Sequence, residues 1–273
     1  MILTVDHLTR YEYDRPVRGV VQSHRLTPSR FEGQKVLDWA VSVSGGLRGG
    51  SFRDGAGDFV QSWTVAGPVS HIEVHVQGRV ETTDLAGVLK GHRETVSPLA
   101  YLRPTPATKP DATITQMAAA FTPNDALGGA HALAAAVADA IAYTPGATHA
   151  ATTAAQALAL GAGVCQDHAQ VLVSAARVAG VPARYISGYL QAGSDGMAHE
   201  AAHAWAELFV QGFGWIGFDP ANRCCPDARY IRLGSGLDAQ DAAPIRGISR
   251  AVGAMGAASE SLDVTVAIAR QEQ

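Results

Sequence analysis

The segment Gly161-Ala162-Gly163-Val164-Cys165-Gln166-Asp167-His168-Ala169-Gln170 decides the fold, because a Gly-x-Gly turn leads directly into a helical pattern. Small or apolar residues recur at helix spacing from Cys165 onward, Arg177 falls in the expected last turn, and Gly180 and Pro182 end the pattern. A helix that begins at Cys165 offers its thiol unpaired backbone N–H groups and a partial positive charge. This setting favours a reactive thiolate, but a free cysteine can equally be a small buried hydrophobe. The segment alone does not decide between the two.

Composition limits the class of protein and its partners. The chain has 273 residues, enough for two domains, with 47% hydrophobic and 17% charged residues, a net charge of −4 and a pI near 6.2. No basic surface for nucleic acid or an anionic membrane is expected. The N-terminus lacks the features of a signal peptide, and no apolar run is long enough to span a membrane. The three cysteines, Cys165, Cys224 and Cys225, form a poor disulfide framework. We therefore expect a cytoplasmic protein.

The first hundred residues alternate between apolar and polar residues, which is typical of antiparallel strands with one solvated face. Glycine-rich breaks separate the runs, so a small β-sandwich or open barrel is expected. The alternating runs cover residues 3–13, 37–43, 59–65 and 72–76. This region shows no chemical site, and its histidines are expected on exposed strand faces. They are His7, His24, His71 and His75.

A proline-rich stretch between Pro98 and Pro110 marks the predicted domain boundary. It divides the chain into a β-rich N-terminal domain, residues 1–108, and a second domain, residues 109–273. Alanine-rich helical patterns follow the boundary, at residues 112–121, 127–143 and 152–160.

The ends of the last of these helices are also readable from the sequence. Thr152 or Thr153 is a suitable N-cap, and Gly161 suits the left-handed position at the C-terminus.

A strand at residues 184–190 is followed by two apolar runs, residues 202–210 and 215–220, that flank a glycine-containing turn and predict a β-hairpin. His203 then lies near the start of one strand and Asp219 near the end of its antiparallel neighbour, at the same end of the hairpin. Their side chains share a face only if facing residue numbers sum to an even value, such as Trp205 opposite Asp219. We therefore predict a connection of three or five residues.

Four motifs resemble the bacterial transglutaminase-like family. They are Gly-x-Cys at 163–165, Arg-Tyr-x-x-Gly-Tyr at 184–189, His-Ala-Trp at 203–205 and Gly-Trp-x-x-Phe-Asp-Pro at 214–220. The resemblance implies an α+β fold, in which an N-terminal antiparallel β-sandwich or barrel-like domain precedes a papain-like core of helices packed on an antiparallel sheet. Residues 244–247 and 262–268 resemble the family's C-terminal strand, so the match spans nearly the whole chain.

The resemblance implies a Cys-His-Asp triad: Cys165 as nucleophile, His203 as general base and acid, and Asp219 as the group that orients His203. The thiolate would attack an amide carbonyl and form a thioester, and the imidazolium would protonate the leaving amine. Hydrolysis is favoured over transamidation, because water is always present and no amine-acceptor site is evident. We expect a peptide or protein amide as substrate and no metal or other cofactor. One departure, Pro220-Ala221-Asn222 where Pro-Thr is commoner, touches no member of the triad.

Supporting residues are nominated around the triad. The backbone N–H of Cys165 is a natural oxyanion donor, and Gln156 or Tyr143 is nominated as the second donor. Trp205, on the same face as His203, would shield the ion pair from water or simply pack in the core. Arg184 is expected to pair with Asp167 or Asp219 in a structural role.

Two alternative classes of function stay open. The run His199-Glu200-Ala201-Ala202-His203 matches the H-E-x-x-H pattern of zinc peptidases, which requires a helix. The following residues lead into a hairpin, however, and no third ligand is evident. Neither Cys165-x-x-His168 nor Cys224-Cys225 completes a metal-ligand spacing. The other alternative is a non-catalytic binding module on the same fold. The sequence does not specify the substrate or the oligomeric state.

Overall fold

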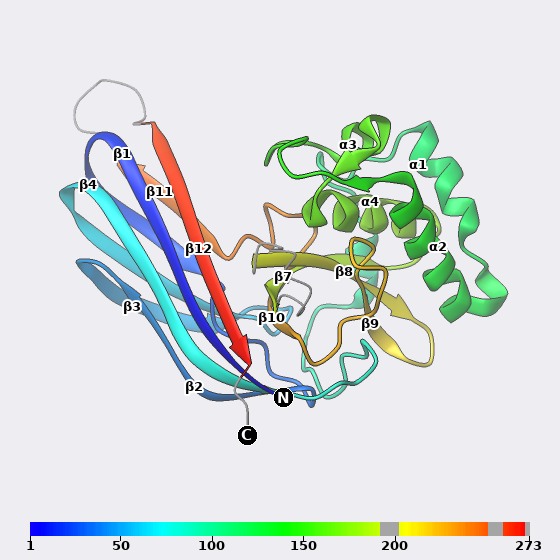
Figure 1. The fold of residues 1–273 in the computed structure, drawn as a ribbon, viewed down its shortest axis with the longest axis horizontal. Helices are drawn as coiled ribbons and strands as arrows, with labels where there is room; N and C mark the ends of the chain where they lie inside the picture. The colour runs from blue at the N-terminus through cyan, green and yellow to red at the C-terminus, as the bar shows by residue number, and fades with distance from the viewer. Residues whose placement is uncertain (192–201, 251–258, 271–273) are drawn as a thin grey trace.

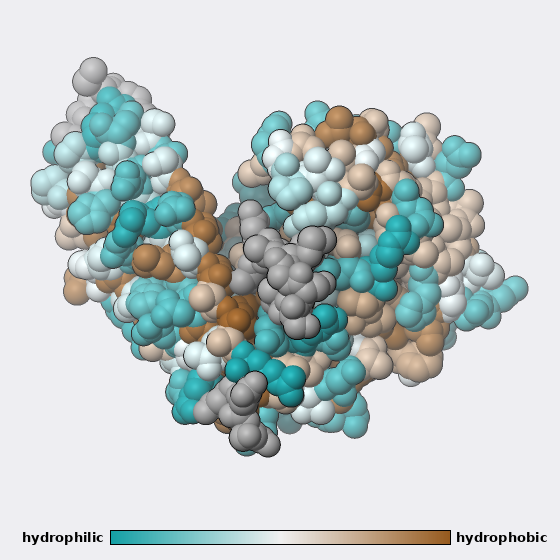
Figure 2. All heavy atoms as spheres, viewed as in Figure 1, coloured by the Kyte–Doolittle hydropathy of each residue, from teal (hydrophilic) through white to brown (hydrophobic). Residues whose placement is uncertain are grey.

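The computed structural model describes residues 1–191, 202–250 and 259–270, which form an antiparallel β lobe beside an α+β core (Figure 1). The fold class expected from the sequence is confirmed. No helix in these ranges is long and apolar enough to cross a membrane. A notch separates the upper ends of the lobe and the core in the space-filling view (Figure 2).

The β lobe is one six-stranded sheet with the order β11-β1-β4-β2, in which β12 also pairs with β1 and β3 with β4. Register shifts near Glu12 and Val17 divide the long strand β1, so β12 lies beside its first half and β11 beside its second. Both halves contribute to one hydrophobic cluster, which includes Val5 and Val20. The sheet therefore folds over its own core as a half-barrel. Its strands are β1 (Ile2–His24), β2 (Gln34–Val43), β3 (Gly46–Arg53), β4 (Phe59–Thr82), β11 (Ile245–Arg250) and β12 (Glu260–Arg270).

The two C-terminal strands belong to this sheet by their pairing. Leu3 on β1 faces Arg270 on β12, and His24 faces Ile245 on β11. The range predicted to form the second domain, 109–273, thus includes strands whose partners lie at the N-terminus. The division at residue 108 stays a prediction, but pairing assigns residues 245–250 and 260–270 to the first sheet.

The folded-over sheet corrects the prediction for two histidines. His7 and His24 are only 5% and 1% exposed, because the inner face of β1 is covered by the second half of the sheet and by the core. His7 Nδ1 and the Tyr189 hydroxyl form a hydrogen bond of 2.6 Å, which connects the β lobe to the core. Burial lowers the pKa of both histidines to about 4. By contrast, His75 lies on the outer face and bonds Asp6 at 2.9 Å.

The core packs four α-helices against a four-stranded antiparallel sheet of order β10-β7-β8-β9. Helix α4 runs against β8 and β7 and is buried on nearly all sides, so it is the centre of this layer. The bounds are α1 (Ala112–Met117), α2 (Ala126–Ala140), α3 (Ala154–Leu160), α4 (Cys165–Val178), β7 (Ala183–Leu190), β8 (Ala202–Val210), β9 (Gly214–Phe218) and β10 (Tyr230–Gly236). Shorter elements are η1 (Pro98–Leu102), η2 (Ala118–Ala120), η3 (Pro123–Asp125), β5 (Ala142–Tyr143) and β6 (Ala162–Gly163).

The helix ends partly follow the sequence signals. Thr153 is the N-cap of α3 in a capping box with Gln156, and Gly161 is left-handed with a φ of 64°. Helix α2 ends earlier than predicted, at Ala140, because Ala142 and Tyr143 leave the helix to pair in parallel with β6.

A buried charge cluster joins the two sheets. Glu207 on β8 accepts hydrogen bonds from Arg184 at 2.7 Å and from Arg232 at 2.8 Å, and Arg232 also reaches Asp58 of the β lobe at 2.8 Å. Arg184 further bonds Glu94 at 2.5 Å. The expected pairing of Arg184 with Asp167 or Asp219 is wrong, since facing positions on β7 and β8 bring it to Glu207.

Candidate active site

Cys165 is the first residue of α4, so its backbone N–H has no partner within the helix. The entry to the helix is fixed by Asp167, whose Oδ2 accepts hydrogen bonds from the Val164 backbone N–H at 2.8 Å and the Thr148 hydroxyl at 2.6 Å. The thiol is 3% exposed and packs beside Ala204 on β8. A rigid helix end therefore presents the sulfur to the sheet.

The β8–β9 hairpin brings His203 to Asp219, as the sequence predicted. Val210 faces Gly214, so the connection has three residues, 211–213, and Ala206 faces Phe218. Extension of this register places Trp205 opposite Asp219, so His203 and Asp219 share a face. The His203 Nε2–H donates to Asp219 Oδ2 at 2.6 Å, and both side chains are buried.

The side chain of Cys165 lies close enough to His203 to raise the pKa of the imidazole, and the thiol itself donates to Gln166 Oε1 at 3.4 Å. Because Nε2 is directed at Asp219, Nδ1 is the ring nitrogen left for the sulfur. Burial by itself would lower the pKa of His203, but the hydrogen bond to Asp219 and the nearby charges of Asp219 and Cys165 raise it to about 10. The ring is therefore held as imidazolium at neutral pH. Sulfur, imidazole and carboxylate are thus buried together, and His203 is hydrogen-bonded to Asp219.

Two residues that the sequence reasoning missed complete the carboxylate's surroundings. Asp219 Oδ2 accepts from the Tyr230 hydroxyl at 2.8 Å and from Asn222 Nδ2 at 2.7 Å, besides His203. Burial alone would raise the pKa of Asp219, but these hydrogen bonds and the charge of His203 lower it. Asn222 stands in the Pro220-Ala221-Asn222 departure, and its backbone N–H donates to Asp219 Oδ1 at 3.2 Å, as aspartate side chains commonly accept in turns. Tyr230 begins β10 and has no comparable local signal.

Aromatic rings cover the imidazole. The Trp205 ring is inclined by 27° to that of His203, with centroids 6.3 Å apart, and Tyr230 meets His203 edge-on at 5.9 Å. Trp205 is 2% exposed. Its place over His203 fits the expected shielding of the ion pair, and it packs in the core as well.

The two residues nominated as second oxyanion donors lie in different places. The Gln156 side-chain oxygen accepts from the Thr153 backbone N–H at 2.9 Å, so this side chain caps α3 and is exposed. Tyr143 pairs through its backbone with Gly163, two residues before Cys165, and its ring lies 6.4 Å from that of His168. Their role in the reaction stays a prediction.

The position of His203 does not fit the zinc-peptidase pattern. This residue lies on a strand and its Nε2 is bonded to Asp219, whereas H-E-x-x-H requires a helical turn. His199 and Glu200 lie outside the described residues. Within the residues that the structure describes, no cluster of three or more potential metal ligands is found. The three cysteines are free thiols.

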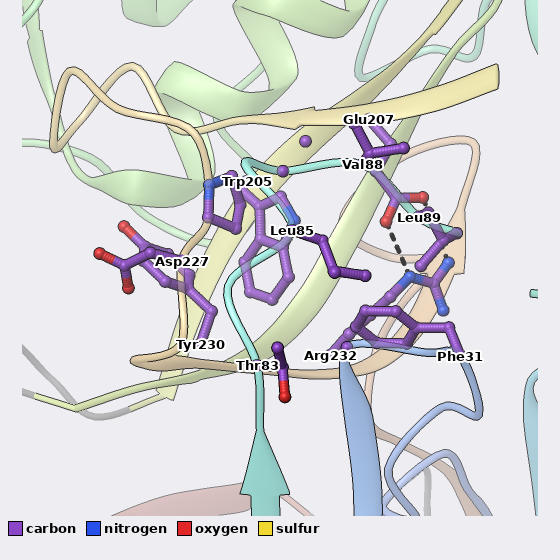
Figure 3. A pocket seen from close by; sticks show the side chains of 14 residues that line it. Phe31, Thr83, Leu85, Val88, Leu89, Trp205, Glu207, Asp227, Tyr230 and Arg232 are labelled. Carbon is purple, nitrogen blue, oxygen red and sulfur yellow. Dashed lines mark hydrogen bonds and ion pairs between the residues drawn. The ribbon is translucent and has the colours of Figure 1, made fainter. Parts of the chain in front are cut away.

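A pocket lies between the core sheet and the β lobe, lined by Trp205, Tyr230 and Phe31 among others (Figure 3). Its walls include Trp205, Glu207, Tyr230 and Arg232 of the core, Phe31 of the β lobe, and residues of the segment after β4, whose end pairs with β9. The lining residues of that segment are Thr83, Leu85, Gly87, Val88 and Leu89. Among the described residues, its lining does not include Cys165, His203 or Asp219. The pocket therefore does not mark the place of the reaction.

The fold and this row of side chains define a class: an α+β core with a cysteine at a helix start and a histidine–aspartate pair on an adjacent hairpin. Residues 115–220 match the model of the transglutaminase-like superfamily, and residues 3–81 match the bacterial transglutaminase-like N-terminal region. An uncharacterized protein of Mycobacterium leprae is 30% identical over 98% of both chains. The chain belongs to the transglutaminase-like family.

Two further comparisons bear on parts of the chain or on the fold alone. A protein-glutamine gamma-glutamyltransferase of Pseudomonas aeruginosa is 33% identical over 82 residues, which is 28% of this chain and 12% of that protein. A solved structure from Cytophaga hutchinsonii, proposed to be a cysteine protease, superimposes with a TM-score of 0.73 at 20% identity. That match covers 100% of this chain and 92% of the other, and it shows a shared fold.

Proposed function

We propose that this protein catalyses thiol-dependent acyl transfer on peptide or protein amides, with Cys165 as nucleophile, His203 as general acid and base, and Asp219 as the residue that orients His203. The observation that carries the proposal is the buried group in which His203 is hydrogen-bonded to Asp219 and has its pKa raised by Asp219 and by the nearby Cys165. A cationic imidazole next to a sulfur at a helix start stabilises the thiolate.

The proposed reaction runs in two steps. The Cys165 thiolate attacks the amide carbon, and the tetrahedral intermediate collapses as the His203 imidazolium gives its proton to the leaving amine. Neutral His203 then takes a proton from water, the resulting hydroxide attacks the thioester, and the thiolate and imidazolium are restored. Asp219 keeps Nε2 protonated, so that Nδ1 exchanges the proton at the sulfur.

Hydrolysis is the proposed outcome, and transamidation differs only in that an amine replaces water in the second step. The relatives support the chemistry of a thioester, since one is named a protein-glutamine gamma-glutamyltransferase and a structural neighbour is proposed to be a cysteine protease. The free thiols fit the cytoplasmic location proposed from the sequence.

Alkylation tests this proposal against a zinc enzyme and a binding module. Fluorescent casein reports hydrolysis, and incorporation of dansylcadaverine into dimethylcasein reports transamidation. We expect iodoacetamide at pH 6 to label Cys165 and to abolish turnover, as Cys165→Ala should. Cys225→Ala is the matched control, because burial raises the pKa of that thiol to about 11. Turnover that survives alkylation but is lost with a chelator would instead indicate a zinc enzyme. A folded protein with no turnover and no fast labelling would indicate a binding module.

A further inference from the structure

Tyr185 on β7 faces the helix that carries the proposed nucleophile. Strand alternation places Tyr185 and Ser187 on the α4 side of the sheet, opposite Ala206 and Ala204 of β8. The ring belongs to the same buried cluster as Cys165 and Ala169, which are one turn apart on α4. Tyr185 thus packs in the buried cluster that encloses Cys165 and the first turn of α4.

The Tyr185 hydroxyl differs from the other buried tyrosine hydroxyls near the site. Tyr189 bonds His7 and Tyr230 bonds Asp219. Tyr185 is 4% exposed, and within residues 1–191, 202–250 and 259–270 no hydrogen bond of its hydroxyl is found. Buried tyrosine hydroxyls usually have a partner. The Tyr185 hydroxyl is therefore a donor that a bound molecule can use.

The charges around the phenol favour a donor role. Burial raises the pKa of Tyr185 well above its ordinary value, and the neighbouring Cys165, Asp167 and Asp238 raise it further. The hydroxyl therefore keeps its proton throughout the range in which an enzyme works. A protonated phenol close to a nucleophilic sulfur can donate to an oxygen that gains negative charge in the reaction.

We propose that Tyr185 is a catalytic residue that donates a hydrogen bond to the carbonyl oxygen of the scissile amide, as the second oxyanion donor beside the Cys165 backbone N–H. This inference rests on the proposed function of Cys165. When the C–S bond forms, the carbonyl π electrons move to the oxygen, which accepts from both donors. When the C–N bond breaks, the C=O double bond re-forms and the proton stays on Tyr185, since His203 supplies the one that leaves with the amine.

The test compares acylation with alkylation in Tyr185→Phe. Acylation of the full chain by 4-nitrophenyl acetate passes through an oxyanion, whereas alkylation by iodoacetamide does not. We expect acylation of Cys165 to slow by about 10- to 100-fold, as for the loss of one charge-assisted donor, while alkylation stays within about twofold of wild type. Tyr189→Phe is the matched control, because it removes a buried hydroxyl from the same strand that bonds His7 instead.

Each other outcome overturns the proposal. Equal acylation in Tyr185→Phe and wild type would show that the hydroxyl does not touch the oxyanion. A parallel loss of acylation and alkylation would show that Tyr185 only packs against the helix. If wild-type Cys165 is not acylated at all, the proposed function fails and this inference fails with it. A Cys165 that acylates normally in both proteins refutes only the role of Tyr185.

Discussion

Replacement of Arg184 by methionine tests how the buried charge cluster holds the sheet that carries His203. Arg184 is fully buried, bonds Glu207 at 2.7 Å and Glu94 at 2.5 Å, and stacks 4.0 Å over the Trp215 ring. Burial alone would raise the pKa of Glu207, but Arg232 and Arg184 lower it to about 2 from 4.5. That difference corresponds to roughly 3 kcal/mol in favour of the ionised carboxylate.

Arg184→Met leaves Glu207 with Arg232 alone and leaves Glu94 without its guanidinium. Breaking a buried ion pair by removing one partner costs about 3–5 kcal/mol. At the lower figure, we expect the melting temperature to fall by roughly 6–12 °C at pH 7. Since the folded-state pKa of Glu207 is depressed, its contribution is complete above about pH 4.5 and disappears as the pH falls through about 2. The deficit of the variant should therefore shrink in acid.

Thermal denaturation followed by circular dichroism at pH 7 and pH 3 measures both effects. Arg10→Met is the matched control, because Arg10 also bonds a glutamate, Glu73, at 2.7 Å, but with side chains 43% and 39% exposed. That change should leave the melting temperature within about 2 °C of wild type. A shift in Arg184→Met no larger than that of the control would refute the reasoning.

Three further predictions concern the site and the pH dependence of stability. Asp219→Asn should lower the pKa of His203 from about 10, because burial is then opposed by fewer stabilising interactions of the imidazolium. Iodoacetamide labelling of Cys165 at pH 6 should slow by about tenfold or more. An unchanged labelling rate would contradict the ion pair. Tyr230→Phe removes the hydroxyl that donates to Asp219 at 2.8 Å. It should lower kcat/KM by about 10- to 100-fold and leave KM little changed. A change in KM alone would show that Tyr230 contacts the substrate instead. Burial lowers the pKa of His24 to about 4, so its folded form is neutral and the protein should lose up to roughly 3 kcal/mol of stability as the pH falls from 6.5 through 4. Urea unfolding at pH 7, 5 and 4 checks this, and a His24→Phe variant with the same acid sensitivity would contradict it.

The sequence predicts the parts of the site that local rules determine. The helix start at Cys165 follows from a glycine turn and apolar spacing. The hairpin follows from two apolar runs around Gly212, and parity alone then puts His203 and Asp219 on one face. Both inferences depend on residues close together in the chain.

The rest depends on pairings between distant segments, which no local pattern encodes. Tyr230 reaches Asp219 because β10 crosses to pair with β7 on the far side of β8. The burial of His7 depends on a sheet that folds over itself and on contact with Tyr189, 182 residues later. The pairing of Arg184 with Glu94 and Glu207 likewise depends on contacts between segments that are distant in the chain. The sequence showed the types of these residues but not their partners.

If Cys165, His203 and Asp219 act together as a triad, an acyl substrate should modify Cys165, and mass spectrometry can test this directly. After incubation of the wild-type chain with a peptide acyl probe at neutral pH, intact-mass and peptide analysis should find one acyl group, as a thioester on Cys165. His203→Ala should lose the adduct while keeping the same melting temperature within a few degrees. An acyl group on another residue, or casein turnover that persists in Cys165→Ala, would contradict the account.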